Sequence, residues 1–141
     1  MSVFRMNLNN SFDWVNQKGI ISAPTNAVEP KDQWALVDNI RIGDTLLLCS
    51  GIKDIGAIAT ATSDTYISDL ELGKASPRFN SGGFRCVNVI FLKVLWQPID
   101  GTKLFKGIVN DNCFRDPHFC AKVEILQETE FASIMSGFFD R

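Results

Sequence analysis

The stretch Ile40–Gly51 has the sequence IRIGDTLLLCSG, and Ile55–Thr62 (IGAIATAT) follows it after a short interval. Thr45–Cys49 within the first stretch is a mainly apolar run of the length typical of a buried strand. The residues between the two runs, Ser50–Asp54, include a glycine and are typical of a turn. Two strand-like runs joined by such a turn predict an antiparallel hairpin.

The residues before this hairpin predict one strand, a short helix, an extended piece and a second helix. Side chains alternate along Val3–Leu8, which indicates a strand, and Asn9-Asn10-Ser11 is typical of a turn and helix cap. A short helix is expected from Phe12 until Gly19, because glycine commonly ends helices in a left-handed conformation. Ile20–Pro24 is a short extended piece, and apolar spacing in Lys31–Ile40 predicts a second helix.

The residues after the hairpin predict a long loop, two further strands and a final helix. Ser63–Gly83 is polar and predicts a loop, whereas Phe84–Trp96 is the longest strand signal and should end near Pro98. Leu104–Cys120 is irregular, Ala121–Leu126 predicts a strand, and a helix starting at Thr129 should place apolar side chains on one face: Phe131, Ile134, Met135 and Phe138. This order predicts an α+β fold in which helices flank a mostly antiparallel, barrel-like sheet.

Composition supports one globular domain over residues 1–141, either a whole protein or the N-terminal part of a larger one. The chain has 141 residues, of which 45% are apolar, enough to form one core. Lys and Arg number 14 against 16 Asp and Glu, so the formal net charge is −2. This balance excludes a strongly cationic nucleic-acid coat protein. No apolar run approaches the roughly 20 residues of a spanning helix, so no membrane association is expected.

The cysteines favour structural roles in a reducing compartment. The chain has four cysteines and no Cys-x-x-Cys pair. Cys49 and Cys86 lie in apolar strand-like runs and are predicted to be core residues. Cys113, His118 and Cys120 lie close together in sequence, but a zinc site needs about four ligands, so we predict no metal or cofactor. Reduced cysteines and a first segment without a signal-peptide pattern predict a cytoplasmic protein.

Binding chemistry is better represented than catalytic chemistry. His118 is the only histidine and lies in no nucleophile-elbow pattern, and no phosphate-binding glycine loop precedes a helix. We therefore do not expect an enzyme. A pocket for a flat ring needs aromatic walls and amide groups, and the chain offers Trp14, Trp34 and Trp96 together with several asparagines. Trp34 is the best wall candidate, and Trp96, at the end of an apolar strand, is the most core-like.

Four stretches in order resemble those of the EVE and YTH domains of the PUA-like superfamily. Phe4–Asn10 (FRMNLNN) resembles the first YTH strand, and Gly19–Pro24 (GIISAP) resembles the YTH segment Gly-Val-Trp-Ser-Ser/Thr. Ile40–Gly51 with the following Ile55–Ala59 resembles the EVE-like hairpin, and Gly83–Val89 resembles the next strand. The chain is most similar to the modified-base-reading domains of McrB-type modification-dependent restriction systems. It departs from the YTH pattern at Ile21, where the cage tryptophan would stand.

The resemblance implies a domain that flips a methylated cytosine or adenine, more in DNA than in RNA, into an aromatic and amide-lined pocket. It would serve as the targeting module of a modification-dependent restriction system, with any cleavage in a fused or separate nuclease or ATPase subunit. Residues expected at the base pocket are Asn9, Asn10, Ile21, Ser22, Trp34, Ser50 and Gly51. Residues expected at the nucleic-acid backbone are Lys53, Lys74, Arg78 and Arg85.

Two other functional classes remain open at this point. A small ASCH-like enzyme acting on a modified nucleoside also uses this fold, and Lys53 with Asp54 is the nearest candidate for its acid–base pair. A protein-interaction or regulatory module would use the phenylalanine-rich last helix, with Phe131, Phe138 and Phe139, as its docking face.

Overall fold

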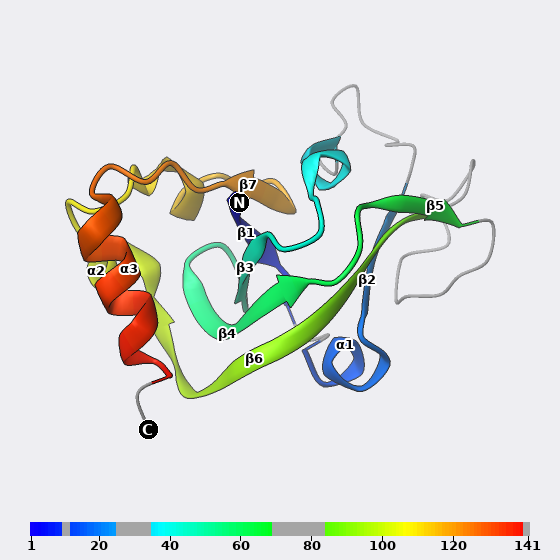
Figure 1. Ribbon diagram of the computed structural model, residues 1–141, viewed down its shortest axis with the longest axis horizontal. Coiled ribbons are helices and arrows are strands. Elements are labelled where there is room, and N and C mark those ends of the chain that lie inside the picture. The colour runs from blue at the N-terminus through cyan, green and yellow to red at the C-terminus, as the bar shows by residue number, and fades with distance from the viewer. Residues whose placement is uncertain (10–11, 25–34, 69–83, 140–141) are drawn as a thin grey trace.

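The computed structural model describes residues 1–9, 12–24, 35–68 and 84–139 (Figure 1). A seven-stranded sheet runs through the molecule, with helices at its two ends. The elements in chain order are β1 (Val3–Asn7), α1 (Phe12–Lys18), β2 (Ile20–Pro24), the 3-10 helix η1 (Ala35–Asn39), β3 (Thr45–Cys49), β4 (Asp54–Ala61), β5 (Tyr66–Ser68), β6 (Phe84–Asp100), α2 (Gly101–Leu104), the 3-10 helix η3 (Asp111–Phe114), β7 (Cys120–Lys122) and α3 (Glu128–Gly137).

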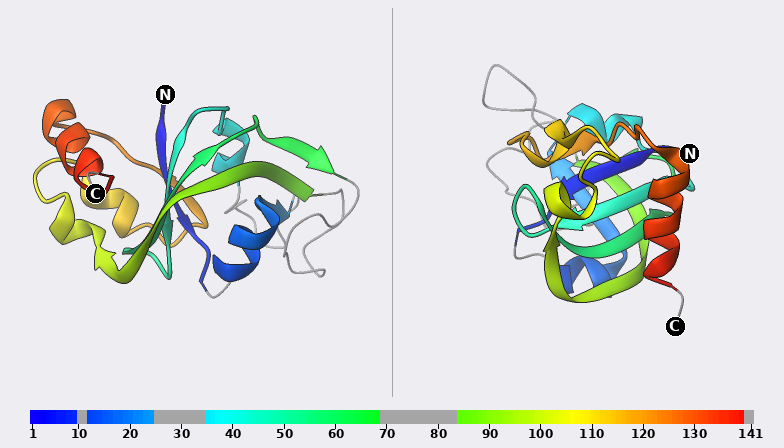
Figure 2. Two further views of the ribbon diagram at one scale, coloured as in Figure 1. Left: turned by 60° about the horizontal axis from the view of Figure 1, so that its bottom comes forward. Right: turned by 90° about the vertical axis from the view of Figure 1, so that its left-hand side faces the viewer.

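The sheet is curled and mixed, so that it forms a half-barrel (Figure 2). Its strand order is β2-β6-β4-β3-β1-β7, and β5 also pairs with β6. Only the pair β1 and β3 is parallel among the described strand pairs, and β3 and β4 form the predicted antiparallel hairpin. The expected α+β class with a mostly antiparallel sheet is confirmed.

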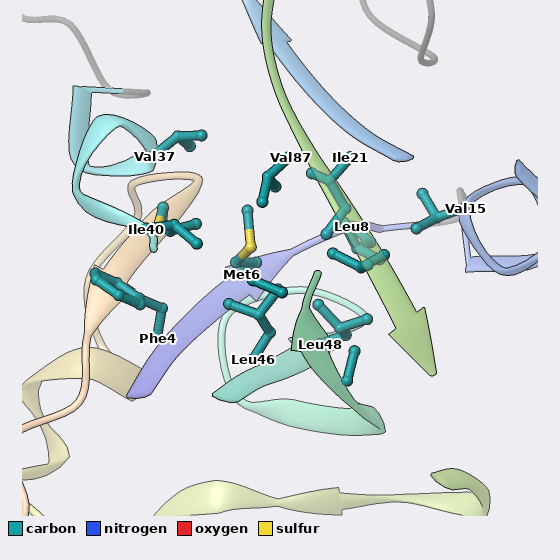
Figure 3. Close-up of a cluster of buried hydrophobic side chains, with 14 of the residues drawn as sticks. Phe4, Met6, Leu8, Val15, Ile21, Val37, Ile40, Leu46, Leu48 and Val87 are labelled. Carbon is teal, nitrogen blue, oxygen red and sulfur yellow. The ribbon is translucent and has the colours of Figure 1, made fainter. Parts of the chain in front are cut away.

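Apolar side chains fill both faces of this sheet. One cluster, beneath α1 and η1, takes Phe4 and Met6 from β1 (Figure 3). The other cluster takes Val3 from the same strand and packs against α2, η3 and α3. Side chains of a strand alternate between the two faces, so a strand buried on both contributes to both clusters. Cys49 and Cys86 are fully buried, as predicted.

The first and last helices follow the sequence pattern closely. The first helix ends at Lys18, and Gly19 after it has a φ of 70°, as expected for a glycine that ends a helix. The last helix begins at Glu128, one residue before the predicted start. Phe131 is buried, and the other apolar residues of that face pack against the second cluster: Ile134, Met135 and Phe138.

Other elements differ in length from the prediction. Of the helix expected over Lys31–Ile40, the structure describes a 3-10 helix at Ala35–Asn39, and residues 31–34 lie outside the described part. The strand expected over Ala121–Leu126 is shorter, Cys120–Lys122, although Val109 and Ile125 form an isolated bridge beyond it. The segment predicted as irregular, Leu104–Cys120, contains the short helix η3, and α2 ends at its first residue.

The long strand β6 extends past the predicted stop at Pro98 and reaches Asp100. Its pairing with β4 runs to Val94 opposite Ala57 and resumes at Ile99 opposite Ile55. Residues 95–98 therefore have no partner in β4. Pro98 is compatible with this part of the strand because no ladder hydrogen bond requires the N–H that proline lacks.

This bulge makes the prediction for Trp96 wrong. Trp96 is 101% exposed instead of lying in the core, because β6 leaves the ladder at this point.

No helix among the described residues is long and apolar enough to cross a membrane.

Candidate nucleic-acid interface

The end of β1 lies against the turn between β3 and β4, which brings together residues predicted from two separate motifs. Asn7 Oδ1 accepts hydrogen bonds from the backbone N–H of Gly51 at 3.0 Å and of Asn9 at 3.1 Å. Leu8 N–H donates to Cys49 O at 2.9 Å, which continues the parallel pairing of the two strands. Asn9 and the Ser50–Gly51 turn thus share one amide acceptor.

Asn9 lies at the surface of this junction. Asn9 is exposed and has a φ of 51°, a left-handed conformation that asparagine adopts more readily than most residues. Ser50 is also exposed, and its N–H closes the turn by donating to Asp54 O at 2.9 Å. Gly51 has a φ of 99°, which favours glycine at this position.

Asn7 is a site residue that the sequence did not single out. Its position is fixed from the other side as well, since its backbone N–H donates to Phe119 O at 2.8 Å. The only sequence signal for it is its place as the last residue of the alternating strand, directly before the expected turn.

The two predicted residues of β2 lie inside the protein. Ile21 is 1% exposed and packs in the first cluster near Leu8, Val15 and Val87 (Figure 3). Its side chain lies beneath the end of β1 and presents no surface wall. Ser22 is also buried, and its Oγ lies 3.6 Å from the Sγ of Cys86 on the paired strand.

The two predicted cations that the structure describes have different surroundings. Lys53 is exposed on the same turn as Gly51, and its Nζ lies 3.6 Å from Asp100 Oδ2. A hydrogen bond from the Thr102 hydroxyl, with Lys53 nearby, holds the pKa of Asp100 below its ordinary value. Arg85 is buried, and its Nε donates to Asp38 Oδ1 at 3.0 Å.

Four other predicted site residues lie outside the described part of the chain: Asn10, Trp34, Lys74 and Arg78. Their roles stay predictions. Among the described aromatic residues near β6, Tyr66 is half-buried, and its hydroxyl donates to Asn88 Oδ1 at 2.6 Å. This bond fixes the ring against β6.

The described residues form no arrangement of three His, Cys, Asp or Glu side chains that could hold a metal ion. Cys113 and Cys120 are buried, and burial raises their pKa values to about 11 and about 12. His118 Nδ1 instead contacts Asp116 Oδ1. Lys53, the cation of the possible acid–base pair, pairs with Asp100.

No family model and no curated protein sequence matches the chain. Solved structures do match it. The Pho92 YTH domain, in complex with m6A, has a TM-score of 0.61 at 14% identity, and the match covers 97% of this chain and 82% of that one. Human THYN1 protein, in complex with 5-methylcytosine-containing DNA, has a TM-score of 0.59 at 12% identity, covering 100% of this chain and 99% of that one. The DUF55 domain of human thymocyte nuclear protein 1 gives 0.58 at 16% identity, over 99% and 100% of the two chains.

The chain has the EVE/YTH-like, PUA-type fold. This likeness confirms the fold that the four sequence stretches implied. Asn9, which the resemblance predicts at the base pocket, follows the end of the first strand in this fold. Ile21 occupies the position expected for the cage tryptophan and faces the core.

Proposed function

We propose that this chain is a nucleic-acid-binding domain that recognises a methylated cytosine or adenine. One observation carries the proposal: its fold is that of domains whose structures hold m6A and 5-methylcytosine-containing DNA, and it presents an exposed amide at the end of the first strand. A reader of this kind needs polar groups of fixed position, and hydrogen bonds to the Asn7 side chain fix the backbones of Asn9 and Gly51 beside each other.

Base recognition would depend chiefly on Asn9. Its amide carries both a donor and an acceptor, which matches the mixed polar edge of a base. The Ser50 hydroxyl would add a second contact from the adjoining turn. Trp34 would stack on the base, with Asn10 beside Asn9, while Ile21 and Ser22 would support the pocket from within β2.

The base would be flipped out of the duplex to reach this pocket. Unstacking costs a few kcal/mol, which stacking and base-edge hydrogen bonds offset. We infer DNA as the preferred nucleic acid, and a modified cytosine at least as readily as N6-methyladenine, because Ile21 replaces the tryptophan wall of the YTH cage.

Contacts to the backbone would come from a few cations around the site. Lys53 on the turn would bind a phosphate, with Lys74 and Arg78 of the long loop, whereas Arg85 would need to exchange its contact with Asp38. With a net charge of −2, the domain would bind weakly and with strong salt dependence.

In the cell, the domain over residues 1–141 would target a nuclease or ATPase, fused or separate, to modified DNA in the cytoplasm. Cleavage would belong to that partner, and the domain itself would be non-enzymatic. Affinity in such a system would come from several reader domains acting together.

The test is fluorescence anisotropy with matched oligonucleotides that carry 5-methylcytosine, 5-hydroxymethylcytosine, N6-methyladenine or no modification. We expect one modified duplex to bind at least about 10-fold more tightly than the unmodified one, since a good base contact is worth about 1–3 kcal/mol. Asn9→Ala and Trp34→Ala should remove that preference. Asn112→Ala, at an exposed asparagine on η3, is the matched control and should retain it. Equal binding of all duplexes, unaffected by either site variant, would refute the proposal.

A further inference from the structure

One edge of β6 has no neighbouring strand over its second half. Residues Phe84–Asn88 pair with β2, and the last bond along that edge joins Val89 N–H to Gly19 O at 2.9 Å. Beyond it, no strand in the described part of the chain lies against this edge. The opposite edge pairs with β4 only as far as Val94, before the bulge. Along the first edge, the backbone of residues 90–98 therefore has no strand partner among the described residues, and another strand could pair there.

The same half of β6 carries four of the nine large exposed apolar side chains of the described residues. Ile90, Leu92 and Val94 are 50–57% exposed, and Trp96 is fully exposed. The bend of β6 comes close to the C-terminal end of α3 (Figure 1). A shallow hollow there is lined by Val94 and Trp96 together with Phe138. Phe139, which is 44% exposed, lines a neighbouring cavity with Leu92. We call Ile90, Leu92, Val94, Trp96 and Phe139 the β6 patch.

The size of the β6 patch approaches what a stable dimer needs. Its five side chains present on the order of 500 Å² of apolar surface, near the upper end for the largest patch on a monomer. A standard interface buries roughly 800 Å² on each partner, and strand pairing would add backbone and neighbouring polar groups to that area. Trp96 is also of the residue type that most often dominates binding energy at interfaces.

A second copy of the chain suits this surface better than an unrelated partner. An antiparallel pair of identical strands is compatible with a two-fold axis, so one open β6 edge is complementary to the same edge of another molecule. Such pairing would satisfy the open backbone groups and bury the apolar side chains beside them at the same time. Lys93 is the single charged residue in 90–98, and its long side chain leaves room for the ammonium group to reach solvent at the rim.

We propose that the chain forms a symmetric homodimer through the β6 patch, with the two β6 strands antiparallel. The junction of Asn9 and Gly51 lies at the β3–β4 turn, and its residues are not part of the β6 patch. The proposal therefore does not depend on which ligand the junction binds.

Sedimentation velocity of the free protein between about 1 and 200 μM tests the proposal without nucleic acid. The wild type should sediment as a dimer at the upper concentrations. Trp96→Glu should weaken self-association at least about 30-fold, the effect of losing a hot-spot residue. Because Trp96 makes no core contact, this variant should retain the circular dichroism spectrum and the melting temperature of the monomer.

A matched control is Ile42→Glu, which puts the same charge at an exposed isoleucine on the turn before β3. It should leave the dimer unchanged. A wild type that stays monomeric to 200 μM would overturn the proposal and leave the β6 patch to a different protein. A dimer that survives Trp96→Glu would overturn the assigned interface.

Hydrogen exchange supplies a second readout specific to strand pairing. Amides of residues 90–97 should exchange more slowly at dimer concentrations than at about 1 μM. The exchange rates of the amides in α1 should be the same at both concentrations. Dimerisation without slower exchange in this segment would contradict pairing of the two β6 strands.

Discussion

At the scale of single residues, one buried cation organises a large part of the C-terminal half. Arg5 is fully buried, and its guanidinium donates to four backbone carbonyls: Cys113 O at 2.7 Å, Asp116 O at 2.6 Å, His118 O at 2.8 Å and Phe119 O at 3.5 Å. These carbonyls belong to an irregular segment that no strand or long helix supports. Arg5 therefore replaces regular secondary structure as the partner of that backbone.

We predict that Arg5→Met destabilises the protein by about 3 kcal/mol or more, because the buried carbonyl of Cys113 and the part-buried carbonyls of Asp116 and His118 would lose their donor. The free energy of unfolding in urea measures the loss. Arg115→Met is the control, since Arg115 makes only an exposed ion pair with Asp111 on the same short segment. It should cost no more than about 0.5 kcal/mol. Equal effects of the two variants would contradict the organising role of Arg5.

In the candidate site, local sequence was enough to predict one asparagine but not the other. The sequence predicted Asn9, an exposed side chain next to a turn, and the structure leaves it exposed there. It did not identify Asn7, because an amide two residues earlier in the strand has no local feature that marks its bond to Gly51 across 44 residues.

At the scale of elements, the junction of β6 and α2 is packed without spare room. Gly101 follows the last residue of β6, and its N–H donates to Lys53 O at 2.8 Å. A Cβ at this position would lie 2.5 Å from two carbon atoms of the Phe114 ring. The glycine therefore allows η3 to pack directly on the end of β6. The hydrogen bond from Gly101 N–H to Lys53 O also links this junction to the turn that carries Lys53.

Gly101→Ala should therefore destabilise the protein by about 1–3 kcal/mol through overpacking. Gly137→Ala is the matched control, because a Cβ there meets no atom within 4 Å and alanine is the better helix former. It should leave stability unchanged or raise it by up to about 1 kcal/mol. Thermal unfolding followed by calorimetry compares the two, and an unchanged melting temperature for Gly101→Ala would show that Phe114 yields readily.

At the scale of the whole molecule, two hydrophobic clusters on opposite faces of one sheet contain three of the four cysteines, and the fourth is buried outside them. Cys49 and Cys113 belong to one cluster and Cys120 to the other, and Cys86 is equally buried. Burial raises the pKa of the Cys49 thiol to about 12, with smaller effects in the opposite direction from Arg5. The thiols therefore stay neutral at pH values where exposed cysteines ionise.

We predict that the folded protein resists alkylation by iodoacetamide at pH 9, where an ordinary thiol with a pKa of 9.0 is half ionised. Only the thiolate reacts, and a raised pKa removes it from the native state. In denaturant, all four cysteines should react, which mass spectrometry of the intact protein would show. Rapid modification of any cysteine in the folded protein would mean that the cluster around it opens on that time scale.

Several features were predictable because short-range patterns encode them. The hairpin of β3 and β4, the helix that stops at Gly19 and the apolar face of α3 all follow from spacing and turn residues over fewer than 20 positions. The four motifs that resembled EVE and YTH domains extended this to the whole fold. The surroundings of Arg85 were not predictable, since Asp38 lies 47 residues away in the sequence.

The sequence by itself determined most of the strands and helices and the α+β, PUA-type fold, because local periodicity and turn chemistry act within each segment. The prediction was wrong at Tyr66–Ser68, which forms β5 inside the expected loop, and it missed the short helix η3, because both depend on contacts with distant segments. Three features were decided by the tertiary structure alone. β1 pairs in parallel with β3, the Asn7 side chain accepts hydrogen bonds from both Asn9 and Gly51, and Trp96 is exposed. Each of these depends on contacts between distant segments and on where a ladder breaks. Such contacts form only when the whole sheet curls, and no residue pattern within β6 records that its ladder with β4 is interrupted after Val94.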